Sequence, residues 1–314
     1  YNYPLEMRIL YNETNGEKGA FVVATNASWG VENVFASEMP IWCSLYDTLG
    51  AHGILNVGAV ANTGQDIDIQ GDMPGTCSSD YLVTVGASNH HDQKSAFSAY
   101  GLEHVDLLAP GEQAPFVGLG GGVGSGFIDG TSVAAPEVTG TIALLYALPC
   151  TQFSEAALNE PAEVAAQIRQ YILGGVDVKP ALQGLVATNG RLNVYNSMKL
   201  QIADYCEVSD CLPPHDMEVD LESTGTLLSW SGNSPEGFSV RYRLFGTEEW
   251  TEVITDVKMF HFLDLMPCAL YEYQIKSNCS NDYGSSNTFF SEGCGECQDL
   301  VYCVPKTVEG TFIT

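Results

Sequence analysis

The sequence has few basic residues. Its 12 lysines and arginines stand against 39 aspartates and glutamates in 314 residues, which gives a formal net charge of −27. So acidic a chain repels phosphate backbones, which argues against nucleic acid as a partner. No block of five or six like charges occurs, so we interpret the acidity as spread over solvated surfaces.

Long apolar runs are also lacking. No uninterrupted hydrophobic stretch approaches the ~20 residues that a helix needs to cross a bilayer, so we expect no membrane span. No signal peptide is recognisable, and the sequence opens on Tyr1 and not on methionine. We therefore expect a mature or trimmed product of a longer precursor.

Cysteine, in contrast, is plentiful. The sequence holds 10 cysteines, an even number. This predicts disulfides, and hence an exported protein, secreted or on the cell surface, because cytosolic proteins rarely carry so many. In the first part of the chain we expect two bridges, Cys43–Cys77 and Cys150–Cys206.

Cys268 and Cys279 cannot pair with each other. They bracket one predicted strand of about 11 residues, which at ~3.3 Å per residue far exceeds the ~6 Å between the Cα atoms of a disulfide. We expect each to pair elsewhere, within Cys294, Cys297 and Cys303. A zinc site at these three cysteines is the alternative, but a single Cys-x-x-C motif in an exported chain favours disulfides.

The first two-thirds of the chain alternates short apolar runs with helical patterns. This alternation predicts an α/β domain with a parallel sheet over 1–206. Pro136 fits its predicted helix only in the first turn. The predicted strands are 21–30, 54–64, 80–88 and 105–111, and the predicted helices are 37–53, 131–148 and 161–175.

The pattern changes after Cys206. A proline-marked linker is predicted over 207–215. Closely spaced strand patterns over 216–293 are typical of an all-β, immunoglobulin-like sandwich. We interpret 294–314, which is polar and contains cysteine, as the start of a further segment.

The stretch from about 212 to 292 resembles a fibronectin type III module. Trp230 and Tyr242 lie in the middle of predicted strands and are expected in its core. Tyr271 follows Pro267 by four residues, which suits the strand of a tyrosine corner.

The segment DGTSVAAPEVTG (129–140) places Ser132 at the start of a predicted helix. A serine hydroxyl is a weak nucleophile until a base takes its proton, and the oxyanion formed by its attack needs preorganised donors. The Ser132 N–H and the positive end of the helix supply part of them. On this stretch alone, an N-cap role for Thr131 or Ser132 is the simpler interpretation.

Four stretches together change that interpretation. GTSVAAPEVTG (130–140) resembles the nucleophile motif of subtilisin-like serine peptidases. Three upstream stretches resemble the same family in the same order: NASWG (26–30), VGAVANTG (57–64), and the series from YLVTVGAS to VDLLAPG (81–111). The order and the loops resemble secreted subtilases of the Bacteroidetes type, which often carry fibronectin-like modules. A subtilisin-like fold lacking its N-terminal part is therefore expected.

The resemblance implies a role for each matching residue. Ser132 would be the acylated nucleophile, and the side-chain amide of Asn62 would join the Ser132 N–H in the oxyanion hole. A turn role for Asn62 and a core role for Trp29 are the alternatives. Ala61 replaces a frequent glycine, which leaves the specificity open. The implied substrate-binding residues are Ser28, Trp29 and Gly30 along the substrate backbone, and Ala59, Val60 and Ala61 at the primary specificity pocket.

The base is the main departure from the family. In subtilases an aspartate motif and a histidine motif precede the serine, and neither motif occurs between Tyr1 and Ser132. We therefore expect the base histidine and its orienting aspartate upstream of Tyr1 or on another chain. No histidine of this chain matches the family's base position: His52, His90, His91, His104, His215 or His261.

The glycine cluster GLGGGVGSG (118–126) does not fit a phosphate-binding loop. It lacks the Lys-Ser/Thr that completes such a loop, and its spacing never satisfies G-x-G-x-x-G. We expect a flexible hairpin ahead of the nucleophile.

The sequence predicts a secreted serine endopeptidase that acts on polypeptides through an acyl-enzyme on Ser132. This chain alone is expected to be inactive for lack of the histidine and aspartate. No cofactor is expected to be required, and calcium is allowed only as a structural ion. The alternative is a non-catalytic, subtilase-derived extracellular protein used in adhesion or assembly.

Overall fold

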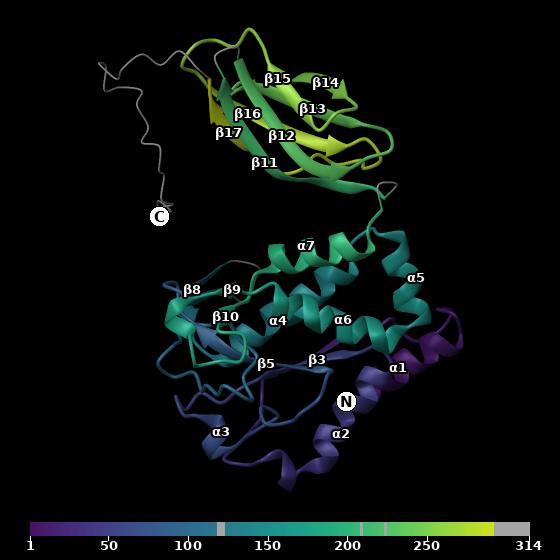
Figure 1. Cartoon of the computed structure of the whole chain (residues 1–314), viewed down its shortest axis with the longest axis vertical. Coiled ribbons are helices and arrows are strands. Elements are labelled where there is room, and N and C mark those ends of the chain that lie inside the picture. The colour runs from purple at the N-terminus through teal and green to yellow at the C-terminus, as the bar shows by residue number, and fades with distance from the viewer. Residues whose placement is uncertain (118–122, 208–209, 223–224, 292–314) are drawn as a thin grey trace. The chain divides into compact units, whose positions relative to one another are not determined.

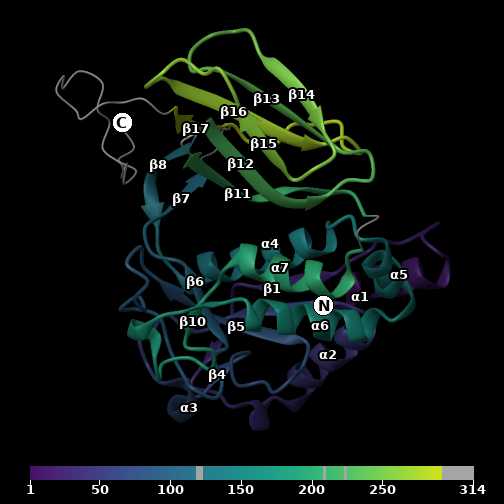
Figure 2. The same ribbon diagram turned by 45° about the horizontal axis from the view of Figure 1, so that its top comes forward.

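The computed structural model describes residues 1–117, 123–207, 210–222 and 225–291. The chain divides into two compact units, Tyr1–Cys206 and Glu207–Thr314. The first unit surrounds a central sheet with helices, and the described part of the second is built of strands (Figures 1 and 2).

A six-stranded sheet forms the centre of the first unit, in the order β1-β3-β5-β6-β10-β9. All neighbouring strands are parallel except β10 and β9, which confirms the predicted parallel α/β sheet. Strands β3 and β5 are buried along their whole length, so their sequences are nearly continuous apolar runs. The strands are β1 (Ala24–Ala27), β3 (Leu55–Ala59), β5 (Leu82–Ser88), β6 (Leu107–Pro110), β9 (Asp177–Val178) and β10 (Gly190–Arg191).

Helices cover this sheet, and α4 packs against four of its parallel strands, β1, β3, β5 and β6 (Figure 2). The predicted helices correspond to α2, α4 and α6, while α1, α5 and α7 were not predicted. The helices are α1 (Asn2–Glu13), α2 (Pro40–Ala51), α3 (Ile67–Gln70), α4 (Thr131–Tyr146), α5 (Thr151–Asn159), α6 (Pro161–Gly174) and α7 (Val194–Tyr205), with 3₁₀ turns at Ala36–Glu38 and Pro180–Leu182.

Two short antiparallel pairs lie outside the main sheet. Strand β2 (Val31–Glu32) pairs with β4 (Asp72–Met73). Strand β7 (Ala114–Val117) pairs with β8 (Val123–Ile128), which confirms a hairpin ahead of the nucleophile. Part of the glycine cluster, 118–122, lies outside the described residues.

Pro136 differs from the prediction, because it lies inside α4 and not in its first turn. Proline has no N–H to donate to the carbonyl four residues earlier, which is that of Ser132. The Ser28 hydroxyl donates to this carbonyl at 2.9 Å instead. A helix-interior proline is therefore tolerated because a side chain from the β1–β2 segment replaces the missing donor.

The first unit contains both disulfides predicted for it. Cys43–Cys77 joins α2 to the segment after β4, and Cys150–Cys206 joins the residues before α5 and after α7. The second unit corrects one prediction. Cys279 pairs with Cys211 and not with a C-terminal cysteine, because the start of β11 lies beside the end of β16, where the Ser277 hydroxyl donates to the Leu212 carbonyl at 2.7 Å.

Cys268 is also disulfide-bonded, and not to Cys279. Cys294, Cys297 and Cys303, which entered both the disulfide and the zinc interpretations, lie outside the described residues.

Two antiparallel sheets make up the described part of the second unit, β11-β12-β15 and β14-β13-β16-β17. One apolar core takes side chains from both sheets and includes Trp230, while Tyr242 is only partly buried against it. The strands are β11 (Leu212–Glu222), β12 (Gly225–Asn233), β13 (Phe238–Leu244), β14 (Thr251–Thr255), β15 (Met259–Phe262), β16 (Leu270–Ser277) and β17 (Asn287–Phe290).

Two local features of this unit bear on the sequence predictions. The Tyr271 hydroxyl accepts a hydrogen bond from the Met266 N–H at 3.0 Å, the contact expected of a tyrosine corner. Strand β11 begins at Leu212, inside the segment predicted as a linker. Leu212 is buried, so these residues join the sheet and do not form a solvated connection.

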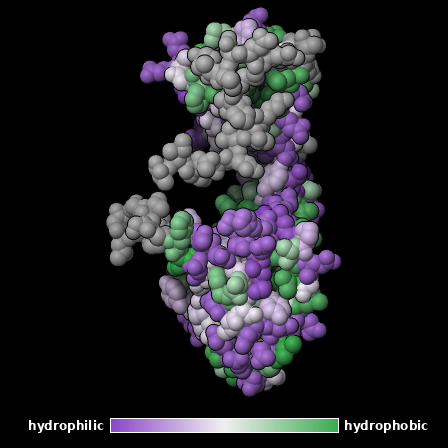
Figure 3. Space-filling model, turned by 90° about the vertical axis from the view of Figure 1, so that its left-hand side faces the viewer, coloured by the Kyte–Doolittle hydropathy of each residue, from purple (hydrophilic) through white to green (hydrophobic). Residues whose placement is uncertain are grey.

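The surface of the first unit carries many hydrophilic residues, spread over the face seen in Figure 3 and not gathered in one patch. Among the described residues, no single helix is both long and apolar enough to cross a membrane. Helices α4 and α5 meet that test only as a pair, and a bend of 110° separates them.

Candidate active site

Ser132 lies in the first turn of α4, two residues after Gly130, which is the N-cap. Gly130 has a φ of +154°, and a Cβ there would lie 2.8 Å from the Ser132 hydroxyl oxygen. Glycine therefore keeps the hydroxyl accessible. Within the described chain, the Ser132 N–H has no acceptor, so this donor at the positive end of the helix remains available to an anion.

Asn62 follows β3 and reaches the same helix end. Its Oδ1 accepts from the Thr131 N–H at 3.0 Å and from the Thr131 hydroxyl at 3.2 Å. Because a backbone N–H can only donate, these bonds fix the amide with its oxygen toward Thr131. The NH₂ group of Asn62 has no acceptor within the described chain. The Asn62 NH₂ group and the Ser132 N–H are thus two free donors whose residues line the same cavity.

A series of hydrogen bonds connects the β1–β2 segment to Ser132. The Asn26 amide donates to the Ser28 hydroxyl at 2.8 Å, and Ser28 donates to the Ser132 carbonyl. From α4, the Thr139 hydroxyl donates back to Asn26 at 3.1 Å. These contacts fix the position of Ser28 relative to Ser132.

The segment Ser28–Gly30 runs past this point close to β4. A Cβ on Gly30 would lie 2.0 Å from the Met73 carbonyl, so only glycine allows this approach. Trp29 is 58% exposed, which makes the core alternative for this residue wrong. Its ring lies 5.0 Å from that of Trp42 and 6.4 Å from that of Tyr1.

All eight residues predicted for the site line one cavity of about 110 Å³. Strand β3 and the residues after it form one wall, the Ser28–Gly30 segment another, and the start of α4 a third. The predicted residues on these walls are Ser28, Trp29, Gly30, Ala59, Val60, Ala61, Asn62 and Ser132, and Thr131 completes the third wall.

Two acidic residues line the same cavity and were missed by the sequence analysis, Glu32 and Asp72. Asp72 is 2% exposed, and its Oδ2 accepts from the Ala61 N–H at 3.2 Å. Burial raises the pKa of Asp72 to about 7, the Ala61 N–H opposes the rise, and the Glu32 charge adds to it. No motif marks either residue, and the signal lies only in the pairing of two short strands.

No histidine lines this cavity in the described part of the chain. His52 is the C-cap of α2, and His90 and His91 lie side by side in an exposed turn with their rings tilted by 46°. His104 pairs with Asp68 at 2.8 Å. His215 and His261 belong to strands of the second unit. The described chain thus brings together Ser132 and Asn62, the predicted nucleophile and oxyanion donor, with no histidine beside them.

A bound metal ion needs several ligand side chains close together. Inside either unit, the described residues bring together no group of three or more carboxylate, histidine or cysteine side chains close enough to share an ion. A structural calcium ion therefore stays a prediction.

The subtilase family model, peptidase S8, matches residues 9–174, slightly more than half of the chain. The chain belongs to the subtilase family. The match spans every predicted site residue and the whole parallel core from β1 to β6, so the resemblance drawn from the motifs is confirmed.

Among relatives of this subtilase is Alkaline protease 1 of Aspergillus clavatus, 30% identical over 168 residues, which are 53% of this chain and 37% of the relative. Subtilisin-like protease 2 of Pseudogymnoascus destructans is 33% identical over 141 residues, 45% of this chain and 32% of the relative. The matches thus span about a third of the length of these relatives.

Two solved structures are similar to the chain. The self-cleaved protease domain of PatA has 25% identity and a TM-score of 0.45, with 64% of this chain and 68% of that chain covered. The A-subunit of the AB5 toxin from E. coli has 24% identity and a TM-score of 0.45, with 57% and 60% covered.

Proposed function

We propose that the protein is a secreted serine endopeptidase that hydrolyses peptide bonds through an acyl-enzyme on Ser132. The observation that carries the proposal is the joint placement of the Ser132 hydroxyl, the Ser132 N–H and the Asn62 amide at the positive end of α4. Membership of the subtilase family supports it.

The chemistry follows from these groups. The Ser132 oxygen attacks the carbonyl carbon of the substrate while a base removes its proton, and the new oxyanion accepts hydrogen bonds from the Ser132 N–H and the Asn62 amide. The amine leaves with a proton from the same base, and water then hydrolyses the ester. The base and its orienting carboxylate are proposed to come from residues outside this sequence.

A fluorophosphonate probe tests the proposal, because it bonds only to an activated serine. We would label the protein expressed from its complete coding sequence and, in parallel, residues 1–314 alone. The expected result is one adduct on Ser132 in the complete protein, lost in Ser132→Ala. Absence of an adduct in the complete, folded protein would overturn the proposal.

The alternative is a non-catalytic chain used for adhesion or assembly. The lack of a histidine at the cavity within the described chain favours it. The same labelling experiment decides, since an adduct that disappears in Ser132→Ala contradicts this alternative.

The second unit is proposed to be a fibronectin type III-like module. Its two antiparallel sheets, shared core and Tyr271 contact support this proposal.

Export is supported by the disulfides Cys43–Cys77, Cys150–Cys206 and Cys211–Cys279. Turnover is proposed to need no cofactor. Peptide hydrolysis measured before and after dialysis against a chelator tests this, and the rate should not change. If the chelator abolishes hydrolysis and added calcium restores it, the protein needs a structural calcium ion.

A further inference from the structure

The cavity at Ser132 has an acidic side formed by two strands. Glu32 of β2 and Asp72 of β4 are direct partners in the antiparallel pairing. Directly opposed residues project to the same face of the ribbon, with Cβ atoms roughly 5 Å apart, and like charges in this position are destabilising. Both residues line the cavity. The fold therefore holds two carboxylates close together at a cost in stability.

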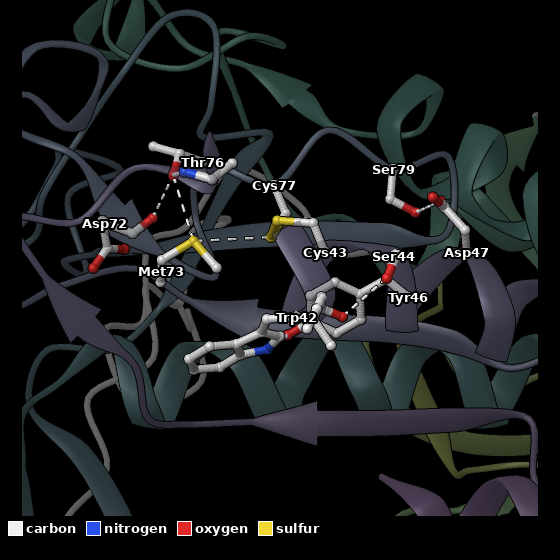
Figure 4. The surroundings of a disulfide bond; sticks show 12 residues. Trp42, Cys43, Ser44, Tyr46, Asp47, Asp72, Met73, Thr76, Cys77 and Ser79 are labelled. Atoms are coloured by element: carbon white, nitrogen blue, oxygen red, sulfur yellow. Dashed lines mark hydrogen bonds between the residues drawn. A yellow bond between two sulfur atoms is a disulfide. The ribbon is translucent and has the colours of Figure 1, made fainter. Parts of the chain in front are cut away.

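Asp72 is held firmly in this position. The Thr76 hydroxyl donates to its backbone carbonyl at 2.9 Å, and the Cys43–Cys77 disulfide follows one residue later. Figure 4 shows Met73 between Asp72 and this disulfide. The carboxylate is thus fixed by a covalently tied segment and does not lie on a free loop.

The burial of Asp72 is poorly compensated by the protein itself. Its carboxylate accepts the Ala61 N–H, and none of the described residues that line the cavity is basic. A carboxylate buried with few partners is costly, and a cation beside it removes much of that cost. Protonation relieves part of this cost, and a cation that enters the cavity from outside would relieve it without a proton.

We propose that Asp72 and Glu32 select substrates with lysine or arginine on the acyl side of the scissile bond. This inference rests on the proposed function, because the acyl-side residue is the one whose carbonyl lies at Ser132. Its side chain would enter the adjacent cavity and place an ammonium or guanidinium group between the two carboxylates, the geometry in which arginine binds through several donors.

Hydrolysis of matched peptide substrates tests the selection. We would compare acyl-side arginine, citrulline, lysine and leucine, using protein from the complete coding sequence. Citrulline has the shape of arginine without its charge. A charge-assisted hydrogen bond predicts a kcat/KM for arginine about 10- to 100-fold above that for citrulline.

Three variants locate the effect. Asp72→Asn keeps an oxygen for the Ala61 N–H and is expected to lower the arginine-to-citrulline ratio about tenfold or more. Glu32→Gln is expected to lower the ratio less, because Glu32 is exposed and its charge is screened. Glu155→Gln removes a charge that is also exposed, on α5 and outside the cavity, and should leave the ratio unchanged.

The outcomes separate this inference from the proposed function. Hydrolysis without an arginine preference, or a preference that survives in Asp72→Asn, overturns the selection and leaves the peptidase proposal standing. If Ser132 is not labelled and nothing is cleaved, the peptidase proposal fails. The cavity is then tested by calorimetric binding of acetylated tetrapeptides ending in arginine or citrulline. Tighter arginine binding that is lost in Asp72→Asn supports the selection, and equal binding overturns it.

Discussion

The two sides of the cavity have opposite polarity. On one side, the start of α4 and Asn62 present free N–H donors and the positive end of a helix. On the other, Glu32 and Asp72 present carboxylates. The donor side suits a negative charge that develops during acyl transfer, and the acidic side suits a positive charge that the substrate already carries. In the proposed peptidase, the first would act on the transition state and the second on the choice of substrate.

Removal of the nucleophile is expected to have the largest effect. Ser132→Ala in the complete protein should lower kcat by at least about 10⁴-fold, because no other group of the donor side can form the acyl-enzyme. The unfolding free energy should change little, since the Ser132 contact with Ser28 uses the backbone carbonyl. Residual hydrolysis within tenfold of the wild type would place the nucleophile elsewhere.

Asn62→Ala should have the next largest effect. Loss of one oxyanion donor typically lowers turnover about 10²- to 10³-fold, and we expect the loss in kcat with little change in KM. Alanine also removes the oxygen that accepts from Thr131. Asn62→Asp is the control, because it retains that oxygen and replaces the NH₂ donor with a carboxylate oxygen. Turnover near the wild-type value in Asn62→Asp would assign Asn62 to holding Thr131.

The donor side was largely predictable from sequence, because Ser132 and Asn62 each lie within a short sequence motif. Ser132 follows a glycine by two residues and precedes small residues, and Asn62 lies just after a strand, so local patterns mark both. The parallel sheet was predictable for a similar reason, since β3 and β5 are apolar runs. These features depend on neighbours along the chain.

The acidic side was not predictable in the same way. Glu32 and Asp72 are 40 positions apart in the sequence, and only the register of two two-residue strands brings them together. The Cys211–Cys279 disulfide and the donation from Ser28 to Ser132 were missed for the same reason. Each depends on a tertiary contact between distant segments, and no local pattern records it.

The pH dependence of stability tests the acidic side next. The pKa of Asp72 is about 7 in the folded chain against an ordinary 3.8. Above pH 7 the folded state therefore bears the full cost of the buried charge. As the pH falls toward 4, the folded state binds a proton that the unfolded state does not, and stability rises. Glu32 from β2 is the charged group that faces Asp72, and the lining residues from α4 are neutral.

Asp72→Asn is neutral at every pH and removes this dependence. The difference in unfolding free energy, variant minus wild type, should be largest at pH 8. It should fall by up to about 4 kcal/mol between pH 8 and pH 4, at about 1.4 kcal/mol per pH unit below pH 7. Urea unfolding of both proteins across this range measures the difference. A constant difference would show that Asp72 is ionised throughout, while Glu155→Gln should follow the wild-type curve.

The smallest expected effect concerns the contact that supports the donor side. Ser28→Ala leaves the Ser132 carbonyl without a donor, because Pro136 has no N–H to give it. We expect a loss of about 1 kcal/mol in the unfolding free energy of the first unit. Pro136→Ala introduced into Ser28→Ala restores a helical N–H four residues after Ser132 and should recover that loss.

The double variant separates two roles of Ser28. If the hydroxyl only satisfies the carbonyl, turnover and stability recover together once the helix supplies its own donor. If Ser28 also positions the Ser28–Gly30 segment along the substrate, stability recovers while KM stays raised. Because that segment borders both sides of the cavity, the second result would show that one hydroxyl couples the placement of the substrate backbone to the helix that carries the nucleophile.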